Sequence, residues 1–76
     1  MYNISGKLSV LIKGDMTAEQ AINLPILDEE GHQIGKITSV DVENDEFHGE
    51  VDNIYYERLY PATPRAMSFL MSKGVV

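Results

Sequence analysis

Residues 26–52 decide the fold, and they read Ile26-Leu27-Asp28-Glu29-Glu30-Gly31-His32-Gln33-Ile34-Gly35-Lys36-Ile37-Thr38-Ser39-Val40-Asp41-Val42-Glu43-Asn44-Asp45-Glu46-Phe47-His48-Gly49-Glu50-Val51-Asp52. Apolar residues occupy mostly alternate positions, and two turn signals, Glu29-Glu30-Gly31 and Asn44-Asp45, interrupt them. This pattern is typical of antiparallel strands that bury one face. The stretch therefore predicts a meander of three consecutive strands.

The turn residues also predict how the strands pair. Gly31 suits the left-handed position of a type I turn with a bulge, so Asp28 is expected opposite His32 and Ile26 opposite Ile34. A two-residue turn at Asn44-Asp45 pairs Val42 with Phe47 and Asp41 with His48. On this register one face holds Val40, Val42, Phe47 and Val51.

One inconsistency within the meander predicts an irregular strand. Ile34 and Ile37 have opposite parity, so a regular strand cannot turn both inward. Gly35 between them marks a bulge or a sharp coil, or else Ile37 joins Leu11 and Leu27 on a second face covered by the carboxy-terminal segment. We expect a bent sheet that combines the two.

The segments before the meander predict one more strand and a short helix. Leu8, Val10 and Ile12 share one face of an alternating pattern, with Lys7, Ser9, Leu11 and Lys13 on the other, which predicts a first strand over residues 7–13 after a frayed terminus. Thr17 and Gln20 have the spacing of a capping box. Because Pro25 disfavours helix at the residue before it, the helix that follows covers residues 18–23 at most.

The segments after the meander have a different character. Residues 54–60 hold three of the four tyrosines and predict an aromatic connector. A helix over residues 63–73 follows, with Thr63 as its cap, Pro64 at its first position and Gly74 just beyond its end. Apolar residues occupy a broad arc of this helix, which is more apolar surface than one small sheet usually covers.

Together these patterns predict a mainly β fold with added helix (β+α). We expect one domain over residues 1–76: a small antiparallel meander or curled barrel of four or five strands over 7–53, a short N-terminal helical turn, the aromatic connector and a C-terminal helix. The 76 residues include no cysteine, so disulfides and thiolate metal sites are excluded.

The formal charge of −6 is unevenly distributed. Nine of the twelve acidic residues lie between Asp28 and Asp52, where Lys36 is the only base. Such a field repels nucleic acid and anionic lipid and favours basic partner surfaces or simple solubility. The predicted acidic surface comprises Asp28, Glu29, Glu30, Asp41, Glu43, Asp45, Glu46, Glu50 and Asp52.

Catalytic and metal-binding patterns are weak. No serine has the context of a nucleophile elbow or triad, and the glycines form no phosphate loop, so no catalytic residue and no cofactor is expected. His32 and His48 with neighbouring carboxylates offer ordinary metal ligands, but no third ligand is fixed by spacing. For His48 the simpler expectation is a cross-strand pair with Asp41.

The aromatic connector and terminal helix have the composition of an interaction hot spot. Tyr55 and Tyr60 could equally complete a small core, and the helix could close the barrel instead of docking on a partner. We expect association, most simply as a homo-oligomer. The predicted partner-binding residues are Tyr55, Tyr56, Arg58, Tyr60, Met67, Phe69, Leu70 and Met71.

The hairpin at Asp28-Glu29-Glu30-Gly31-His32-Gln33-Ile34-Gly35-Lys36-Ile37, with the strand and acidic turn up to Asp45, resembles the first hairpin of PRC-barrel domains. That family often shows an aspartate, a turn glycine, then isoleucine-glycine-lysine and an aliphatic residue. The resemblance implies a small β-barrel that serves as an adaptor in larger assemblies, such as photosynthetic reaction centres and ribosome-maturation factors. The family supplies no catalytic residues to transfer.

The leading hypothesis is a non-enzymatic interaction or assembly module that binds protein, and neither nucleic acid nor membrane. The short chain suits a phage or mobile-element accessory or structural protein. An acidic inhibitor or nucleic-acid mimic that occupies a basic site is the alternative, and a metal-binding or catalytic domain using His32 and His48 is the third. Without a signal peptide or an apolar span, we expect a cytoplasmic location, or a virion if the chain is phage-encoded.

Overall fold

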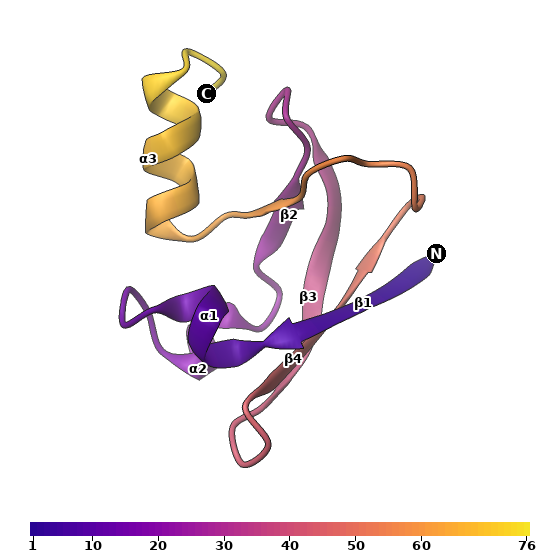
Figure 1. The fold of residues 1–76 in the computed structure, drawn as a ribbon, viewed down its shortest axis with the longest axis vertical. Coiled ribbons are helices and arrows are strands. Elements are labelled where there is room, and N and C mark those ends of the chain that lie inside the picture. The colour runs from indigo at the N-terminus through magenta and orange to yellow at the C-terminus, as the bar shows by residue number, and fades with distance from the viewer.

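The computed structural model describes residues 1–76, and its centre is a five-stranded antiparallel sheet bent into a half-barrel (Figure 1). The strand order is β1-β4-β3-β2-β5. This confirms the predicted small β+α fold. The strands are β1 (Tyr2–Lys7), β2 (Pro25–Leu27), β3 (Gln33–Asp41), β4 (Glu46–Val51) and β5 (Tyr60–Pro61), and the helices are α1 (Leu8–Ile12), α2 (Ala18–Ala21) and α3 (Pro64–Ser72).

The β2–β3 hairpin has the predicted turn and one extra residue. Gly31 has a φ of +83°, and the Asp28 amide donates to the His32 carbonyl at 2.9 Å. Ile26, however, pairs with Gly35 and not with Ile34 as predicted, because the register shifts at this point. Ile34 is therefore a bulge residue, which is how Ile34 and Ile37 can both be buried.

The β3–β4 hairpin has the predicted strands but a different register. Asp41 pairs with Glu46, and Val40 with Phe47, so the connection has four residues and the predicted two-residue turn is wrong. The Asn44 amide and side chain donate to the two Asp41 carboxylate oxygens at 3.1 and 2.7 Å, which stabilises the wider turn.

Two expectations fail with that register. Val42 was expected on the inner face, but it lies in the turn and is 69% exposed. His48 stands opposite Ser39, so the predicted cross-strand pair of His48 with Asp41 is wrong. The other three predicted inner residues point inward: Val51 is buried, and Val40 and Phe47 pack half-buried against the core.

The first strand was predicted too late in the chain. Residues 2–7 form β1 and pair with β4 along their whole length, so they are not a frayed terminus. Residues 8–12 form α1 in place of the predicted strand. The Asp45 carboxylate accepts from the amide and the hydroxyl of Ser9, both at 2.7 Å, and this contact with a distant turn favours helix at Ser9.

The core lies on the concave face of the sheet. Ile26, Ile34, Ile37 and Val51 form its buried centre. Half-buried apolar side chains surround them and come from β1, α1, the residue before β2, β3, β4 and the connector: Ile4, Leu11, Leu24, Val40, Phe47, Tyr56 and Leu59. Residues far apart in the sequence thus close one small core.

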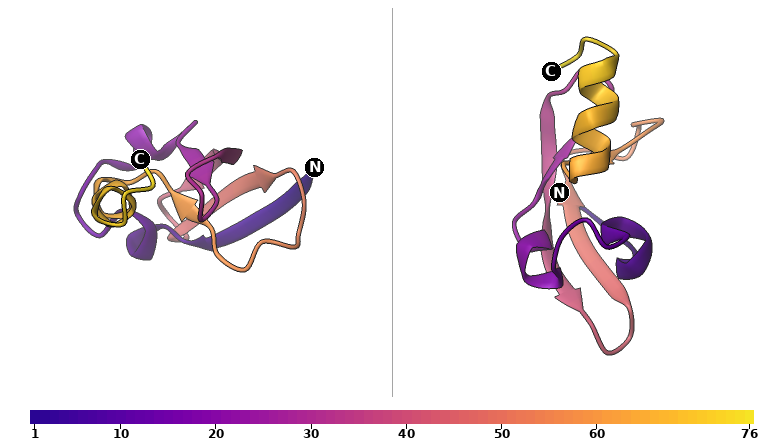
Figure 2. Two further views of the ribbon diagram at one scale, coloured as in Figure 1. Left: turned by 90° about the horizontal axis from the view of Figure 1, so that it is seen from above. Right: turned by 90° about the vertical axis from the view of Figure 1, so that its left-hand side faces the viewer.

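The two capped helices form as predicted. Thr17 and Gln20 make the reciprocal capping box at the start of α2. The Thr63 hydroxyl accepts from the Ala66 amide at the start of α3, Pro64 takes the first position, and Gly74 has a φ of +76° beyond the end. Figure 2 places α1, α3 and the connector on the same side of the sheet. None of the helices is long and apolar enough to cross a membrane.

Gly35 gives a direct test of the sheet. A Cβ atom there would lie 1.9 Å from the Glu50 carbonyl oxygen, so Gly35→Ala must separate β3 from β4. We expect a loss of ~3 kcal/mol or more in the free energy of unfolding, measured by urea denaturation. Gly14→Ala is the control: it meets no atom within 4 Å, and it costs only the strain of a positive φ, ~1 kcal/mol. Equal losses for both variants would contradict the close strand approach.

Candidate interaction surface

The predicted partner-binding residues are divided between two places. Tyr55 and Tyr56 border a hollow that also contains the acidic turn at Asp28–Glu30. Tyr60 and Phe69 border another, beside α3. Arg58 belongs to both hollows. The aromatic connector therefore does not present a single continuous hot spot.

The two neighbouring tyrosines of the connector have different environments. Tyr55 is 84% exposed, and its amide donates to the Asn53 side chain at 2.7 Å. Tyr56 packs against the core, and its hydroxyl donates to the Asp52 carboxylate at 2.5 Å. This hydrogen bond, assisted by partial burial and the nearby charges of Asp52 and Asp28, raises the pKa of Tyr56 to about 12. Tyr56 is thus part of the fold more than of a free surface.

Helix α3 buries Leu70, and its two exposed large apolar residues, Phe69 and Met71, lie on opposite flanks of that buried side. Leu70 is only 1% exposed, so it packs within its own chain and is not available to a partner as predicted. Met67 is half-buried, whereas Met71 is 62% exposed. The Phe69 ring stacks on Tyr60 with centroids 5.8 Å apart, and the Lys73 ammonium lies 4.6 Å from the same ring. We call Arg58, Tyr60, Phe69 and Met71 the α3 surface.

Next to the α3 surface lies the largest hollow of the molecule, with a volume of about 680 Å³. It is bounded by β1, α1, the end of the connector and the start of α3. Its apolar lining includes Val10 and Leu11 from α1, Phe47 from β4 and Leu59 from the connector. The side chains of Lys7, Lys13 and Arg65 also line it, and we call it the basic groove.

The basic groove differs in charge from the rest of the chain. None of its fourteen lining residues is acidic, although the chain has twice as many acidic as basic residues. Arg65 is partly neutralised, because its Nε donates to Asp15 at 3.0 Å. Lys7 and Lys13 have no ion-pair partner within 4.0 Å.

Most of the predicted acidic surface lies at two separate turns. The β2–β3 turn with Asp28, Glu29 and Glu30 and the β3–β4 turn with Glu43 lie at opposite ends of the molecule's long axis (Figure 1). The principal extent along that axis is 36 Å. Glu50 on β4, opposite Lys36, and Asp52 just after β4 belong to neither turn.

The carboxylates of the β3–β4 turn serve the fold. The Asn44 side chain, followed by its amide, holds the pKa of Asp41 below the ordinary value of 3.8. The hydroxyl and then the amide of Ser9 do the same for the pKa of Asp45. Both carboxylates are stabilised in their charged form by hydrogen bonds within the chain.

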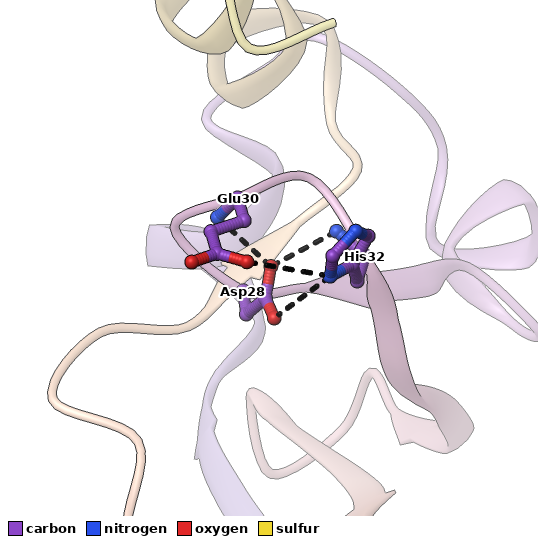
Figure 3. A group of neighbouring side chains, drawn as sticks. All are labelled: Asp28, Glu30 and His32. Atoms are coloured by element: carbon purple, nitrogen blue, oxygen red, sulfur yellow. Dashed lines mark hydrogen bonds and ion pairs between the residues drawn. The ribbon is translucent and has the colours of Figure 1, made fainter.

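The possible metal ligands are only partly brought together. Figure 3 shows Asp28, Glu30 and His32 in the β2–β3 turn, with ligand atoms within 4.8 Å of one another. One Asp28 oxygen already accepts from the Glu30 and His32 amides, both at 2.9 Å, so the turn itself explains this arrangement. His48 is on β4, 3.5 Å from Glu46, and does not join the group. The structure thus does not assemble the predicted pair of histidines.

No protein-family model matches the chain, and no curated protein or solved structure is significantly similar to it. Function must therefore be argued from the surface itself.

The sequence predictions missed the basic groove. The predicted first strand includes Val10 and Lys13, so it does not place them on a helix. Because 57 residues separate Lys7 from Arg65, no local pattern brings these two bases together. One signal was present: Leu8, Leu11 and Ile12 have the i, i+3, i+4 spacing of a helix, which competes with the alternation of Leu8, Val10 and Ile12.

The pKa shifts predict acid sensitivity. A carboxyl whose pKa is lowered by folding contributes stability above its unfolded pKa, and this contribution is lost as the pH falls through the folded pKa. We expect Asp45→Asn and Asp41→Asn to lower the urea midpoint at neutral pH and to reduce its decline between about pH 5 and pH 2. Glu43→Gln is the control, because Glu43 is exposed. A wild-type pH profile in both aspartate variants would refute this role.

The Tyr56 bond predicts one late-titrating tyrosine. In a spectrophotometric titration we expect Tyr56 to ionise at about 12. The bond should contribute stability below the ordinary pKa of 10.0 and lose that contribution as the pH rises to about 12. Asp52→Asn should return the pKa of Tyr56 toward 10.0, and Asp28→Asn should change it less. A titration unaltered by Asp52→Asn would contradict the hydrogen bond.

Proposed function

We propose that this protein is a non-enzymatic interaction module that docks on a protein partner through the α3 surface. The supporting observation is the balance of apolar side chains: ten large ones are exposed, while only eight apolar residues are buried. Met71 and Phe69 contribute to the exposed set on one helix. The other eight are dispersed over the chain, whereas these two share a nine-residue helix with the Tyr60 ring stacked against it, and a local apolar surface of this kind is typical of protein-binding sites.

The arrangement of α3 supports the same role. Leu70 anchors the helix, Tyr60, Phe69 and Lys73 form a stacked, preordered group on one flank, and Met71 is exposed on the other flank. Rigid aromatic groups lose little conformational entropy when a partner covers them. The resemblance of residues 28–45 to PRC-barrel domains, which implies an assembly adaptor, agrees with this proposal and stays a prediction.

The acidic-mimic alternative has less support. A mimic of nucleic acid needs a continuous track of negative charge, whereas here two turns at opposite ends of the molecule hold most of the acids, and Glu50 on the strand between them stands opposite Lys36. The carboxylates of Asp28, Asp41 and Asp45 are also engaged by groups of their own chain.

Capture of a partner from an extract of the native host tests the proposal. We expect Phe69→Ala and Met71→Gln each to reduce the captured partner about tenfold or more, equivalent to ~1.4 kcal/mol. Met71 is exposed, and glutamine has nearly the helix propensity of methionine, so Met71→Gln should fold normally. Thermal denaturation of each variant checks this.

Two matched variants make that capture decisive. Tyr55→Ala removes an exposed aromatic at the other end of the connector, and Glu43→Lys reverses a charge in an acidic turn; neither should reduce capture. Loss of capture with Glu43→Lys and at high salt, with Met71→Gln unaffected, would refute the α3 surface and favour the acidic alternative. Light scattering of the purified protein shows whether the partner is a second copy.

A further inference from the structure

The basic groove lies between the two free edges of the half-barrel. Strand β1 pairs only with β4, and β5 only with β2, so each leaves one edge unpaired. Residues 4–7 of β1 all line the groove, and so do Tyr60 and Pro61 of β5. Four consecutive lining residues mean that the backbone edge of β1 faces the groove, and not merely one of its side-chain faces.

Only β1 can pair with an added strand along this groove. A free strand edge presents unpaired amides and carbonyls that an extended peptide can satisfy. Pro61 lacks an amide hydrogen and β5 has only two residues, so β5 offers no comparable edge. Residues 4–7 span about 13 Å, which suits about four or five residues of an extended segment.

The side chains around this edge determine which residue types a bound segment needs. Val10, Leu11 and Leu59 offer apolar surface, and Lys7, Lys13 and Arg65 offer positive charge in a lining without an acidic residue. Arg65 is paired with Asp15 and Lys7 is attracted to Asp45, both outside the lining, so Lys13 carries the charge least engaged within the chain. An extended chain places successive side chains on opposite sides. A segment in which apolar and acidic residues alternate can therefore meet both surfaces at once.

We propose that the basic groove binds an extended acidic segment of a partner protein as an added strand on β1, an inference that rests on the interaction role proposed above. The main chain of the segment pairs with residues 4–7. Its apolar side chains enter the groove between α1 and the connector, and its carboxylates meet Lys7, Lys13 and Arg65.

Other occupants fit less well. Nucleic acid would approach a chain of net charge −6, and Tyr60 is already stacked on Phe69. A second copy of this chain offers its acids mainly in two tight turns, where Asp28, Asp41 and Asp45 already accept hydrogen bonds. Its acidic strand β4 is paired on both edges, with β1 and β3, so a second copy supplies no free extended acidic segment there.

The test uses an end-blocked peptide of about eight residues in which glutamate and valine alternate. Two-dimensional NMR of the labelled full chain follows the amide signals during titration. We expect the largest shifts in residues 4–7 and 10–13. The same peptide with lysine in place of glutamate should not bind, and a version N-methylated on alternate residues should bind at least about tenfold more weakly, because it cannot pair as a strand.

A matched pair of protein variants tests the charge. Lys13→Glu should weaken the acidic peptide about tenfold and permit binding of the lysine peptide. Lys36→Glu makes the same charge change on β3 outside the groove and should leave the affinity within about twofold. Equal effects of the two variants would mean that only net charge matters and would overturn the proposed site.

Three other outcomes would also overturn the proposed site. The first is no shift in residues 4–7 with the acidic peptide, and the second is tighter binding of an oligothymidylate than of the peptide. The third is the same shifts on concentrating the protein alone, which would make the occupant a second copy.

This test gives a result that can be distinguished from the test of the α3 surface. Partner capture that depends on Met71, without peptide binding, would refute the groove and leave the interaction role. Peptide binding without any effect of Phe69→Ala or Met71→Gln on capture would refute the α3 surface and leave the groove.

Discussion

The carboxylate of Asp45 holds the β3–β4 turn against the first turn of α1. It accepts both the amide and the hydroxyl of Ser9, and the Asp45 carbonyl accepts the Leu8 amide at 3.1 Å. Ser9 and Asp45 are 36 positions apart in the sequence, and β1 ends at Lys7, just before the residues that make this contact. The chain then turns into α1, which forms one wall of the basic groove. Both the shape of the sheet edge and the existence of the groove depend on this junction.

Local signals allowed the capped helices and the three-stranded meander to be predicted. Thr17, Thr63 and Pro64 act on neighbouring amides, and Gly31 occupies a left-handed turn position, so a few adjacent residues determine each outcome. The bulge at Ile34 was also indicated, because two apolar residues of opposite parity both needed burial. Such features depend on contacts within a few residues along the chain.

The register of β3–β4 and the position of α1 depended on information that local patterns lack. Asn44-Asp45 suits a two-residue turn, but the Asp41 side chain captures Asn44 and widens it. The segment 8–12 is compatible with a strand or a helix, and a distant carboxylate decides between them. The groove could not be predicted for the same reason, because β1 and α1 form its walls together with the connector and α3. Its basic residues are scattered in the sequence and meet only in the folded chain.

The carboxylates of this chain divide into two groups. The side chains of all five aspartates accept hydrogen bonds within the chain: Asp15, Asp28, Asp41, Asp45 and Asp52. Short carboxylates of this kind satisfy backbone amides in turns and helix starts, as those of Asp28, Asp41 and Asp45 do here. The seven glutamates supply the remaining negative charge. The bases are fewer, yet three of the six line one groove beside an unpaired strand edge, and no acidic residue lines it with them. The groove therefore differs in sign of charge from the chain as a whole, and this local difference is what an acidic segment of a partner would meet.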